Sequence, residues 1–217
     1  MSAPFDLSQT DHLLTTTRAV RKRLDLTREV PRDLILECVS IATQAPAGGN
    51  VQNWRWLVVD DPQLKAGLAD LYRKAYEPYI ASQRSLVQSV GRSDASAIMA
   101  SSDHLAQVLD QVPAMVIPCQ LGRPEATMRQ GDLAGAYGSI LPAVWSFMLA
   151  ARSRGLGTAW TTLHLGYEAE AAELLGIPPN VSQVALTPVA YYTGDDFKIA
   201  SRLPADRVTY FNGWKQR

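Results

Sequence analysis

The sequence has no excess of charge of either sign. Among its 217 residues, 21 are Lys or Arg and 21 are Asp or Glu, so the formal net charge at pH 7 is zero. A balanced chain has no general electrostatic attraction to nucleic acid or to an anionic membrane. We therefore expect neither as a partner.

Cysteine and histidine are scarce as well. The two cysteines, Cys38 and Cys119, lie in apolar stretches, which is typical of small core residues and argues against a disulfide framework. The three histidines, His12, His104 and His164, are far apart, and none has a metal-ligand spacing to a cysteine or carboxylate. We expect no metal site.

Targeting and membrane-spanning segments are missing from the sequence pattern. Residues 1–14 have no basic region followed by an apolar core, so they do not read as a secretory signal. No apolar run approaches the length of a membrane span. The sequence therefore predicts a soluble cytoplasmic protein, and its length fits a single domain over residues 1–217.

Familiar catalytic motifs are also missing. There is no Gly-x-Ser-x-Gly elbow and no pair of carboxylates placed as acid and base. Gly48-Gly49-Asn50 is followed by Val51 and not by Lys-Ser, so it is not a Walker loop. We therefore name no catalytic side chain and expect a cofactor to carry the reaction.

The most informative stretch that is present runs from Gln44 to Val59. Apolar residues from Leu34 onward fit one face of a helix, and Pro46 is expected to end it. Gly48 and Gly49 permit positive φ and a close approach to a ligand. The carboxamides that follow, and then a strand over 56–59, would form a polar wall beside a rigid element. A plain surface turn is the alternative, because Gly, Pro and Asn are common turn residues.

The densest basic cluster is Arg18-Ala19-Val20-Arg21-Lys22-Arg23, which follows a predicted helix over 11–20. Four cations within six residues favour a local anion, and a phosphate suits the planar donor fork of arginine. A solvated helix end, where cations complement the helix dipole, is the alternative.

The remaining pattern predicts several helices and a few strands. A polar excursion over 82–112 is either a lid over a site or a surface hairpin. The predicted helices cover 62–79, 132–152 with a kink at Pro142, and 168–175 closed by Gly176; the predicted strands cover 114–119, 158–163 and 184–192, with Pro188 at a bulge or edge; a long non-helical tail covers 195–217.

Three segments, taken together in their order, carry a resemblance to one family. They are Arg18-Ala19-Val20-Arg21 with Val30-Pro31; Ala45-Pro46-Ala47-Gly48-Gly49-Asn50-Val51-Gln52-Asn53-Trp54; and Gly155-Leu156-Gly157-Thr158, Leu175-Gly176-Ile177-Pro178 and Arg202-Leu203-Pro204. In order and spacing they resemble the FMN-dependent nitroreductases. The resemblance implies an α+β fold, with helices around a central mixed β-sheet, in an intertwined homodimer with flavin at the interface.

The resemblance also implies which residues bind FMN. Arg18, Arg21 and Arg202 would hold the phosphate and ribityl end. The implied cofactor-binding set is Arg18, Ala19, Val20, Arg21, Pro46, Ala47, Gly48, Gly49, Asn50, Gln52, Trp160, Thr161, Thr162 and Arg202. Backbone around residues 160–162 would face the dimethylbenzene and N5 side of the flavin.

This chain departs from the family pattern at four positions. Ala19 and Ala47 replace serines, Asn53 replaces a proline, and Ala200 replaces a lysine found in some relatives. Lys22, Arg23 or Lys198 could supply the missing phosphate contacts. The resemblance still implies FMN binding, but it leaves open which residues contact the FMN phosphate.

The implied activity is hydride transfer from NADPH or NADH to FMN, followed by reduction of a nitroaromatic, a quinone or a similar small acceptor in the same pocket. One alternative is a protein that sequesters flavin without efficient turnover. Others are specialised chemistries such as reductive dehalogenation or flavin cleavage. Arg92, Arg123 and Arg129 could read a 2′-phosphate, but the sequence does not choose between the two donors.

Overall fold

The computed structural model describes residues 4–90, 95–125 and 127–214. The chain divides into two compact units, and each is described by itself. The larger unit spans Arg18–Gly194; the smaller, terminal unit combines Met1–Thr17 with Asp195–Arg217.

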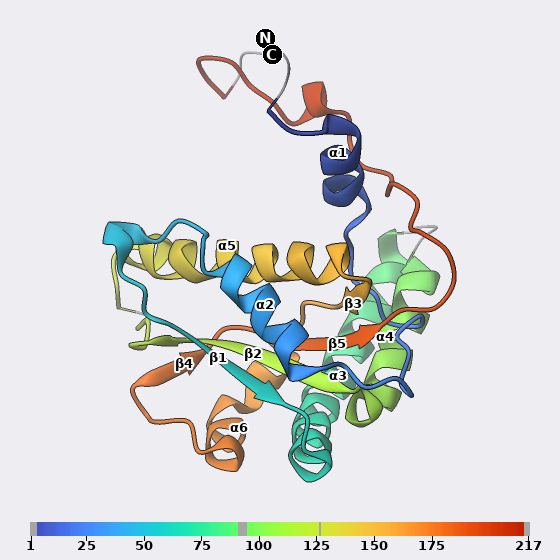
Figure 1. The fold of residues 1–217 in the computed structure, drawn as a ribbon, viewed down its shortest axis with the longest axis vertical. Coiled ribbons are helices and arrows are strands. Elements are labelled where there is room, and N and C mark those ends of the chain that lie inside the picture. The colour runs from blue at the N-terminus through green and yellow to red at the C-terminus, as the bar shows by residue number, and fades with distance from the viewer. Residues whose placement is uncertain (1–3, 91–94, 126, 215–217) are drawn as a thin grey trace. The chain divides into compact units, whose positions relative to one another are not determined.

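The larger unit is built on a five-stranded sheet (Figure 1). Its strands are β1 (Trp54–Val59), β2 (Ala114–Leu121), β3 (Leu156–Thr158), β4 (Val181–Gln183) and β5 (Thr187–Tyr191). Their order is β1-β2-β5-β3, and β4 also pairs with β2. The ladders are antiparallel, and the parallel pairing is confined to isolated bridges such as Ala19 with Thr158. The predicted α+β class is confirmed.

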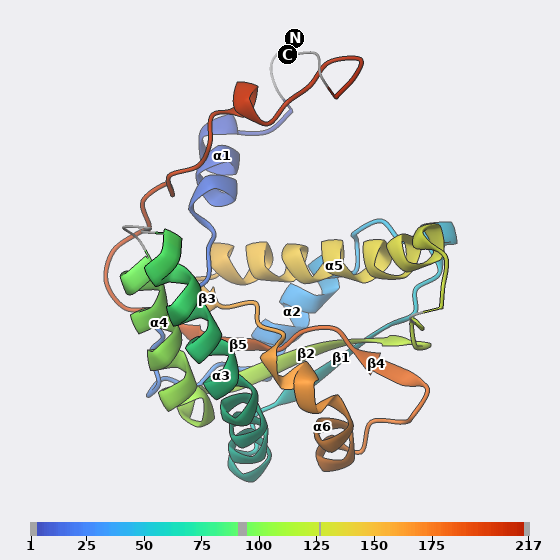
Figure 2. The same cartoon turned by 180° about the vertical axis from the view of Figure 1, so that it is seen from behind.

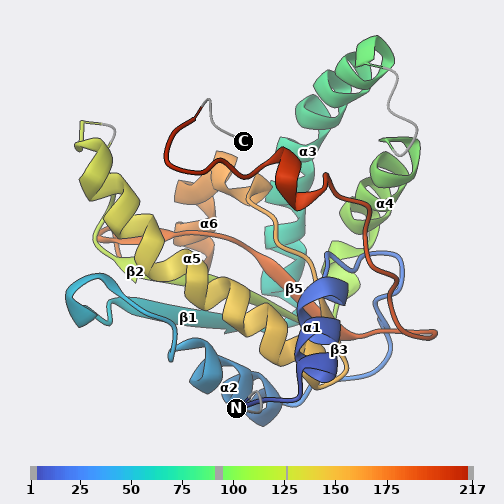
Figure 3. The same cartoon turned by 90° about the horizontal axis from the view of Figure 1, so that it is seen from above.

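Helices cover both faces of this sheet. The helices of the larger unit are α2 (Arg32–Ala42), α3 (Pro62–Val90), α4 (Ala95–Val108), α5 (Gln130–Ser153) and α6 (Glu168–Leu175). Helices α2 and α5 lie on one face and α3 and α6 on the other, and α4 packs on α3 (Figure 1, Figure 3). Figure 2 shows the same layers from behind.

The core lies between the sheet and α5. The Phe147 ring on α5 packs 5.5 Å from the Trp56 ring on β1, centroid to centroid. Cys38 and Cys119 are both buried and free, as the sequence predicted for core residues. Burial raises the pKa of the Cys119 thiol to about 12, so this thiol stays protonated and unreactive at neutral pH.

Two helix predictions are confirmed at or near their predicted bounds. Helix α6 spans the predicted residues, and Gly176 closes it in the left-handed conformation at φ 66°. Helix α5 fits the predicted 132–152 within two residues, but it continues through Pro142 without a break. Its packing against α2 and the sheet offsets the one hydrogen bond that proline removes.

Other predicted bounds are wrong. Helix α3 continues past Pro78 to Val90, and α2 ends at Ala42, four residues before Pro46. The predicted strand over 158–163 is instead the shorter β3, which ends where its ladder with β5 ends at Val189. Thr161 returns to the sheet only through an isolated bridge to Leu186.

The predicted strand over 184–192 is shorter in the structure, where only β5, Thr187–Tyr191, lies in this range. Residues 184–186 separate β4 from β5, which lies between β2 and β3. Pro188 is paired with Met115 inside β5, so it marks neither a bulge nor an edge strand.

Helix α5 is also long and apolar enough to cross a membrane, judged by length and composition. The expectation that no run approaches that length is therefore wrong for this helix. A core helix passes the same test, and eight α5 residues from Ser139 to Ala151 are buried against the rest of the larger unit.

The terminal unit contains α1 (Leu7–Thr16) and a tail without a long helix. Asp6 caps α1 by accepting a hydrogen bond from the Gln9 N–H at 3.2 Å, so the helix begins and ends earlier than predicted. His12 on α1 is bonded to Asp196 in the tail. The tail has one short 3-10 turn, Ala205–Arg207, and exposes large apolar side chains: Ile199, Leu203, Val208, Phe211 and Trp214.

Candidate functional site

The basic cluster lies beside β3 as an extended segment. The Val20 N–H donates to the Thr158 carbonyl at 2.7 Å, and Ala19 forms a parallel bridge with the same residue. Val20 is 3% exposed, and Gly157 packs so closely on it that an added Cβ would lie 3.0 Å away. Helix α1 ends at Thr16 and has no basic residue in its last turn, so the cluster follows the helix and is not part of it.

This arrangement places Arg21 at a cavity of about 300 Å³. The other wall of the cavity comes from Trp160, Thr161 and Thr162, which follow β3. Four sequence-predicted residues therefore meet in one space, brought together by the pairing of residues 19 and 20 with Thr158. The volume is at the low end of the range typical of ligand pockets, about 300–1,000 Å³.

Three tyrosines of α3 complete this cavity, and sequence reasoning missed them. Tyr72, Tyr76 and Tyr79 share one helical face, and Ser102 of α4 joins them. The Tyr72 and Tyr76 rings stack with centroids 6.0 Å apart and an interplanar angle of 12°. Their i, i+4, i+7 spacing was visible in the sequence, but there it reads equally well as a core-facing stripe.

The hydroxyls of this aromatic wall are held in place. Tyr76 donates to Asp103 Oδ1 at 2.7 Å, and Arg84 donates to both oxygens of the same carboxylate at 3.2 Å. Burial, and then the Asp103 carboxylate, raise the pKa of Tyr76. Burial also raises the pKa of Tyr72, although a hydrogen bond with Thr161 and the charge of Arg21 oppose it. Both directions keep the Tyr72 and Tyr76 rings neutral at physiological pH.

The glycine-amide turn is a separate feature. The Gly48 N–H donates to Ser139 Oγ on α5 at 3.0 Å. Gly49 and Asn50 have positive φ, 58° and 54°, whereas Gly48 does not. Pro46, Gly48, Gly49, Asn50 and Gln52 are exposed and Ala47 is half-buried. The turn thus presents backbone and amide groups outward from an anchor on α5.

The 48–50 turn lies near the N-terminal end of α5, and β3 lies near its C-terminal end (Figure 1). Ser139 anchors the turn, whereas β3 begins at Leu156, just after α5 ends at Ser153. After β3 the chain turns back, because Trp160 packs on the buried cluster that includes Ile140 and Val184, and Ala47 of the turn packs on the same cluster. The structure therefore brings Arg21 together with residues 160–162, and none of residues 46–52 lines this cavity.

The remaining predicted residues have other surroundings. Arg202 belongs to the terminal unit, where it is exposed and donates to the Ser201 carbonyl at 2.9 Å. Arg123 is ion-paired with Glu168 and Arg129 with Asp132. Arg92 lies outside the described residues.

The polar excursion over 82–112 forms part of the cavity wall. Its described parts are the last turns of α3, helix α4 and a 3-10 turn, Leu109–Gln111, and Ser102 of α4 lines the cavity. The lid stays a prediction. Gly91, the glycine expected at its centre, lies outside the described residues.

A buried histidine lies two residues after Thr162. His164 is fully buried, and neither ring nitrogen has a hydrogen-bond partner among the described residues, although the Gln183 amide lies beside the ring. Burial lowers the pKa of His164 to about 4, so the imidazole is neutral at physiological pH. Across residues 4–90, 95–125 and 127–214, no group of three or more His, Cys, Asp or Glu could hold a metal ion.

Three solved structures share this fold. Iodotyrosine deiodinase bound to FMN and 3-iodo-L-tyrosine matches with TM-score 0.68 at 19% identity, over 93% of this chain and 98% of that one. A BluB-like flavoprotein from Clostridium difficile 630 matches with TM-score 0.68 at 17% identity, over 96% and 100% of the two chains. The FMN- and NADPH-dependent nitroreductase NfnB of a Sphingopyxis strain matches with TM-score 0.65 at 20% identity, over 97% and 100%. A model of the Nitroreductase family matches residues 14–191, and the chain belongs to that family.

Proposed function

We propose that this protein is an FMN-dependent oxidoreductase that takes hydride from NADPH or NADH and reduces small electron-poor acceptors. The observation that carries the proposal is the cavity in which Arg21 meets residues 160–162 under a wall of three tyrosines. Membership of the Nitroreductase family supports it, as do solved relatives described as FMN-bound and as FMN- and NADPH-dependent.

The residues around the cavity fit a flat, anionic cofactor. Neutral tyrosine and tryptophan rings provide surfaces for a planar ring system. Arg21 at the cavity and Arg18 three residues earlier supply cations for a phosphate. Trp160, Thr161 and Thr162 form the opposite wall, and their segment is held by the two backbone hydrogen bonds between Thr161 and Leu186, at 3.0 and 2.8 Å.

Each part of the chain then has a defined task. Arg18 and Arg21 would bind and orient the phosphate end, and the wall formed by residues 160–162 would position the reacting edge. A flavin held there would supply the chemistry of hydride and electron transfer between the nicotinamide and the acceptor. Donor and acceptor would occupy the same cavity in turn, which gives a ping-pong cycle. No titrating side chain is assigned a catalytic step.

We infer that a complete site needs two copies of the chain. The 46–52 turn is largely exposed, and none of its residues lines the cavity at Arg21. A partner with α5 crossing in the opposite direction would bring its turn to this cavity. The exposed apolar side chains of α2 and α5 support such a homodimer: Leu36, Ile41, Tyr137 and Trp145.

The tyrosine rings of the cavity favour flat aromatic acceptors. Nitroaromatics and quinones are flat, so they can stack between the tyrosines and a bound flavin. We place this activity in the cytoplasm, where reduced nicotinamides are supplied, and treat residues 1–217 as one functional domain.

A specialised reduction is the second candidate. Its support is the fold shared with a deiodinase whose structure contains 3-iodo-L-tyrosine, together with the aromatic wall described above. Reductive dehalogenation of a phenol would use the same cavity. A protein that only sequesters flavin would have the same cofactor contacts without turnover.

The deciding experiment is a visible absorption spectrum of the purified protein, followed by anaerobic addition of NADH or NADPH. We expect a flavin spectrum that one donor bleaches within seconds and that a nitroaromatic or quinone restores. A flavin that neither donor bleaches would favour sequestration or a specialised reductant. A protein that takes up no FMN would overturn the proposal.

A further inference from the structure

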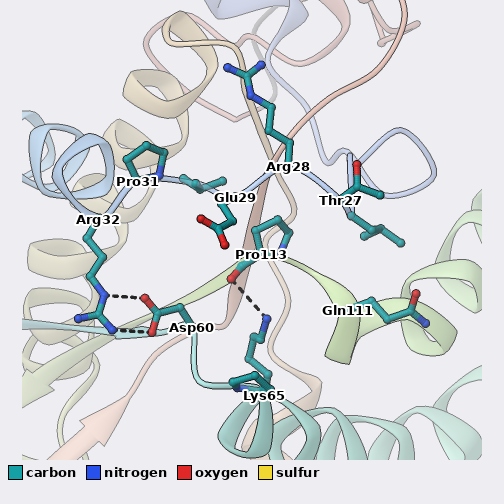
Figure 4. A pocket seen from close by; sticks show the side chains of 12 residues that line it. Thr27, Arg28, Glu29, Pro31, Arg32, Asp60, Lys65, Gln111 and Pro113 are labelled. Atoms are coloured by element: carbon teal, nitrogen blue, oxygen red, sulfur yellow. Dashed lines mark hydrogen bonds and ion pairs between the residues drawn. The ribbon is translucent and has the colours of Figure 1, made fainter.

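A second cavity, of about 500 Å³, lies away from the predicted flavin residues and shares none of them (Figure 4). It forms where the segment that enters α2 crosses the start of α3 and the turn before β2. The walls combine apolar side chains with charged ones; the apolar lining residues are Leu26, Val30, Pro31, Pro62 and Pro113.

Lys65 supplies a buried cation to this cavity. Its side chain belongs to a residue only 8% exposed, and its Nζ donates to the Val112 carbonyl at 2.7 Å and the Pro113 carbonyl at 3.4 Å. Within the described part of the chain, no carboxylate oxygen lies within 4.0 Å of this Nζ. The Asp60 carboxylate, which Arg32 also pairs, interacts with this charge only from beyond hydrogen-bond distance. A buried ammonium whose hydrogen bonds go to neutral acceptors favours a bound anion.

The position of Lys65 near the start of α3 further disfavours its positive charge. Asp61 caps the helix by accepting from the N–H groups of Gln63 and Leu64, each at 2.9 Å. Lys65 follows directly, near the positive end of the helix dipole, where a cation is disfavoured. Neither its burial nor its place on the helix stabilises the charge.

Glu29 supplies an anion on the other side of the same space. Figure 4 shows its carboxylate and the Lys65 ammonium reaching into the cavity from opposite sides. No basic nitrogen of the described chain lies within 4.0 Å of the Glu29 carboxylate. Two opposite charges thus face the cavity without pairing with each other.

The other charged lining residues are paired elsewhere. Arg32 donates to both oxygens of Asp60, at 2.6 and 2.7 Å, which neutralises that carboxylate. The Arg28 guanidinium lies 3.3 Å from the centroid of the Tyr191 ring and points away from the space between Glu29 and Lys65 (Figure 4). Lys65 and Glu29 are therefore the charges available to a ligand.

We propose that this cavity binds a small zwitterion with an apolar body, of the class of an aliphatic α-amino acid. Its carboxylate pairs with Lys65, its ammonium pairs with Glu29, and its side chain packs on the leucine, valine and proline walls. A simple anion would leave the Glu29 carboxylate unpaired and facing it. This site does not depend on flavin binding or on the proposed oxidoreductase activity.

The test compares ligands of matched shape by calorimetry and thermal shift on the full chain with its flavin. L-leucine carries both charges, 4-methylpentanoate lacks the ammonium, and 3-methylbutylamine lacks the carboxylate. An aliphatic probe is chosen so that stacking on the tyrosine wall does not contribute. We expect L-leucine to bind at least tenfold more tightly than either analogue and than inorganic phosphate.

Two substitutions test whether L-leucine binds in this cavity. Lys65→Met keeps the length of the side chain and removes its charge, and Glu29→Gln keeps the shape of the other side chain. We expect each to weaken L-leucine at least tenfold, while Lys74→Met, at an exposed position on α3, changes nothing. If Lys65→Met does not fold, the exposed Glu29→Gln still decides the question.

Several results would overturn the proposal. Equal binding of 4-methylpentanoate or phosphate would make the cavity a plain anion site. Binding of L-leucine that both variants leave unchanged would place the ligand elsewhere. An absence of binding by every probe would leave Lys65 and Glu29 as a solvent-bridged pair with a structural role only.

Discussion

The two parts of the predicted flavin site differ in how the chain holds them. Residues 18–21 and 160–162 are tied into the sheet, with Val20 buried and its N–H bonded to Thr158. The 46–52 turn is exposed and is held to α5 by the Ser139 hydroxyl. A region fixed by its own fold supplies the cavity, and a region that projects outward is suited to complete the cavity of another chain.

The largest loss of flavin binding is expected when the cations of the buried part are removed. Arg18→Ala with Arg21→Ala should leave a folded protein that no longer retains FMN. Two lost charge-assisted hydrogen bonds, at about 1.5–3 kcal/mol each, correspond to a weakening of roughly 10²–10⁴-fold in Kd. The absorbance ratio of flavin to protein after desalting measures this. Saturation of the doubly substituted protein would contradict the phosphate assignment; Arg129→Ala, a surface change, is the control.

Mixed dimers test whether the two parts act across chains. Gly49→Val places a β-branched residue at φ 58° and should spoil the turn. Coexpressed with the double arginine variant, it should give mixed dimers with one intact site in two, although each variant alone retains no flavin. Tandem affinity tags isolate the mixed species, and flavin content measures the sites. Mixed dimers without flavin would show that each site is built from one chain.

How far the sequence predicted these parts depends on the distance over which each signal acts. Helix α6 and its closing Gly176 follow from local spacing and a left-handed cap, so they were predictable. The continuation of α3 past Pro78 and of α5 past Pro142 depends on packing against other elements, which a local helix-breaking rule does not contain.

The candidate site was likewise predicted only in part from the sequence. Arg21 and Thr161 were found from motif resemblance, because their segments are matched one by one. The tyrosine wall was missed because its stripe on α3 has the spacing of any core face. The absence of residues 46–52 from the cavity lining follows only from the path of the folded chain, which motif resemblance does not contain.

His164 should make the stability of the buried part depend on pH. Its pKa is about 4 in the folded protein, against 6.5 for an ordinary histidine, so the unfolded chain binds more protons between these values. Stability should therefore fall as pH drops from about 6.5 to 4, by about 3 kcal/mol in total. Denaturant unfolding at a series of pH values measures it.

His164→Leu should flatten this pH dependence, whereas His104→Leu, at a half-buried position on α4, should leave it unchanged. Equal slopes in wild type and His164→Leu between pH 6.5 and 4 would assign the acid sensitivity to other groups. A change in flavin affinity in His164→Leu would add that this buried ring supports the segment at Thr161 and Thr162.

The smallest effect is expected at the anchor of the exposed turn. Ser139→Ala removes the acceptor for the Gly48 N–H, at a cost of about 1 kcal/mol, because water can replace the lost bond at an exposed backbone. FMN affinity should fall several-fold while the cavity keeps its shape. Fluorescence titration with FMN measures it, and Ser153→Ala on the same helix is the control. A loss as large as that of the arginine variant would mean that the turn contributes more than the cations.

The exposed apolar residues of the chain should make its stability and flavin content depend on protein concentration. Trp214 is 80% exposed and Phe211 67%, and α2 and α5 expose further large apolar side chains. In the proposed homodimer these surfaces leave water only when two chains meet, so assembly contributes to folding stability by mass action. The melting temperature should then rise with protein concentration. The fraction of flavin bound should fall on dilution even when free FMN is kept constant.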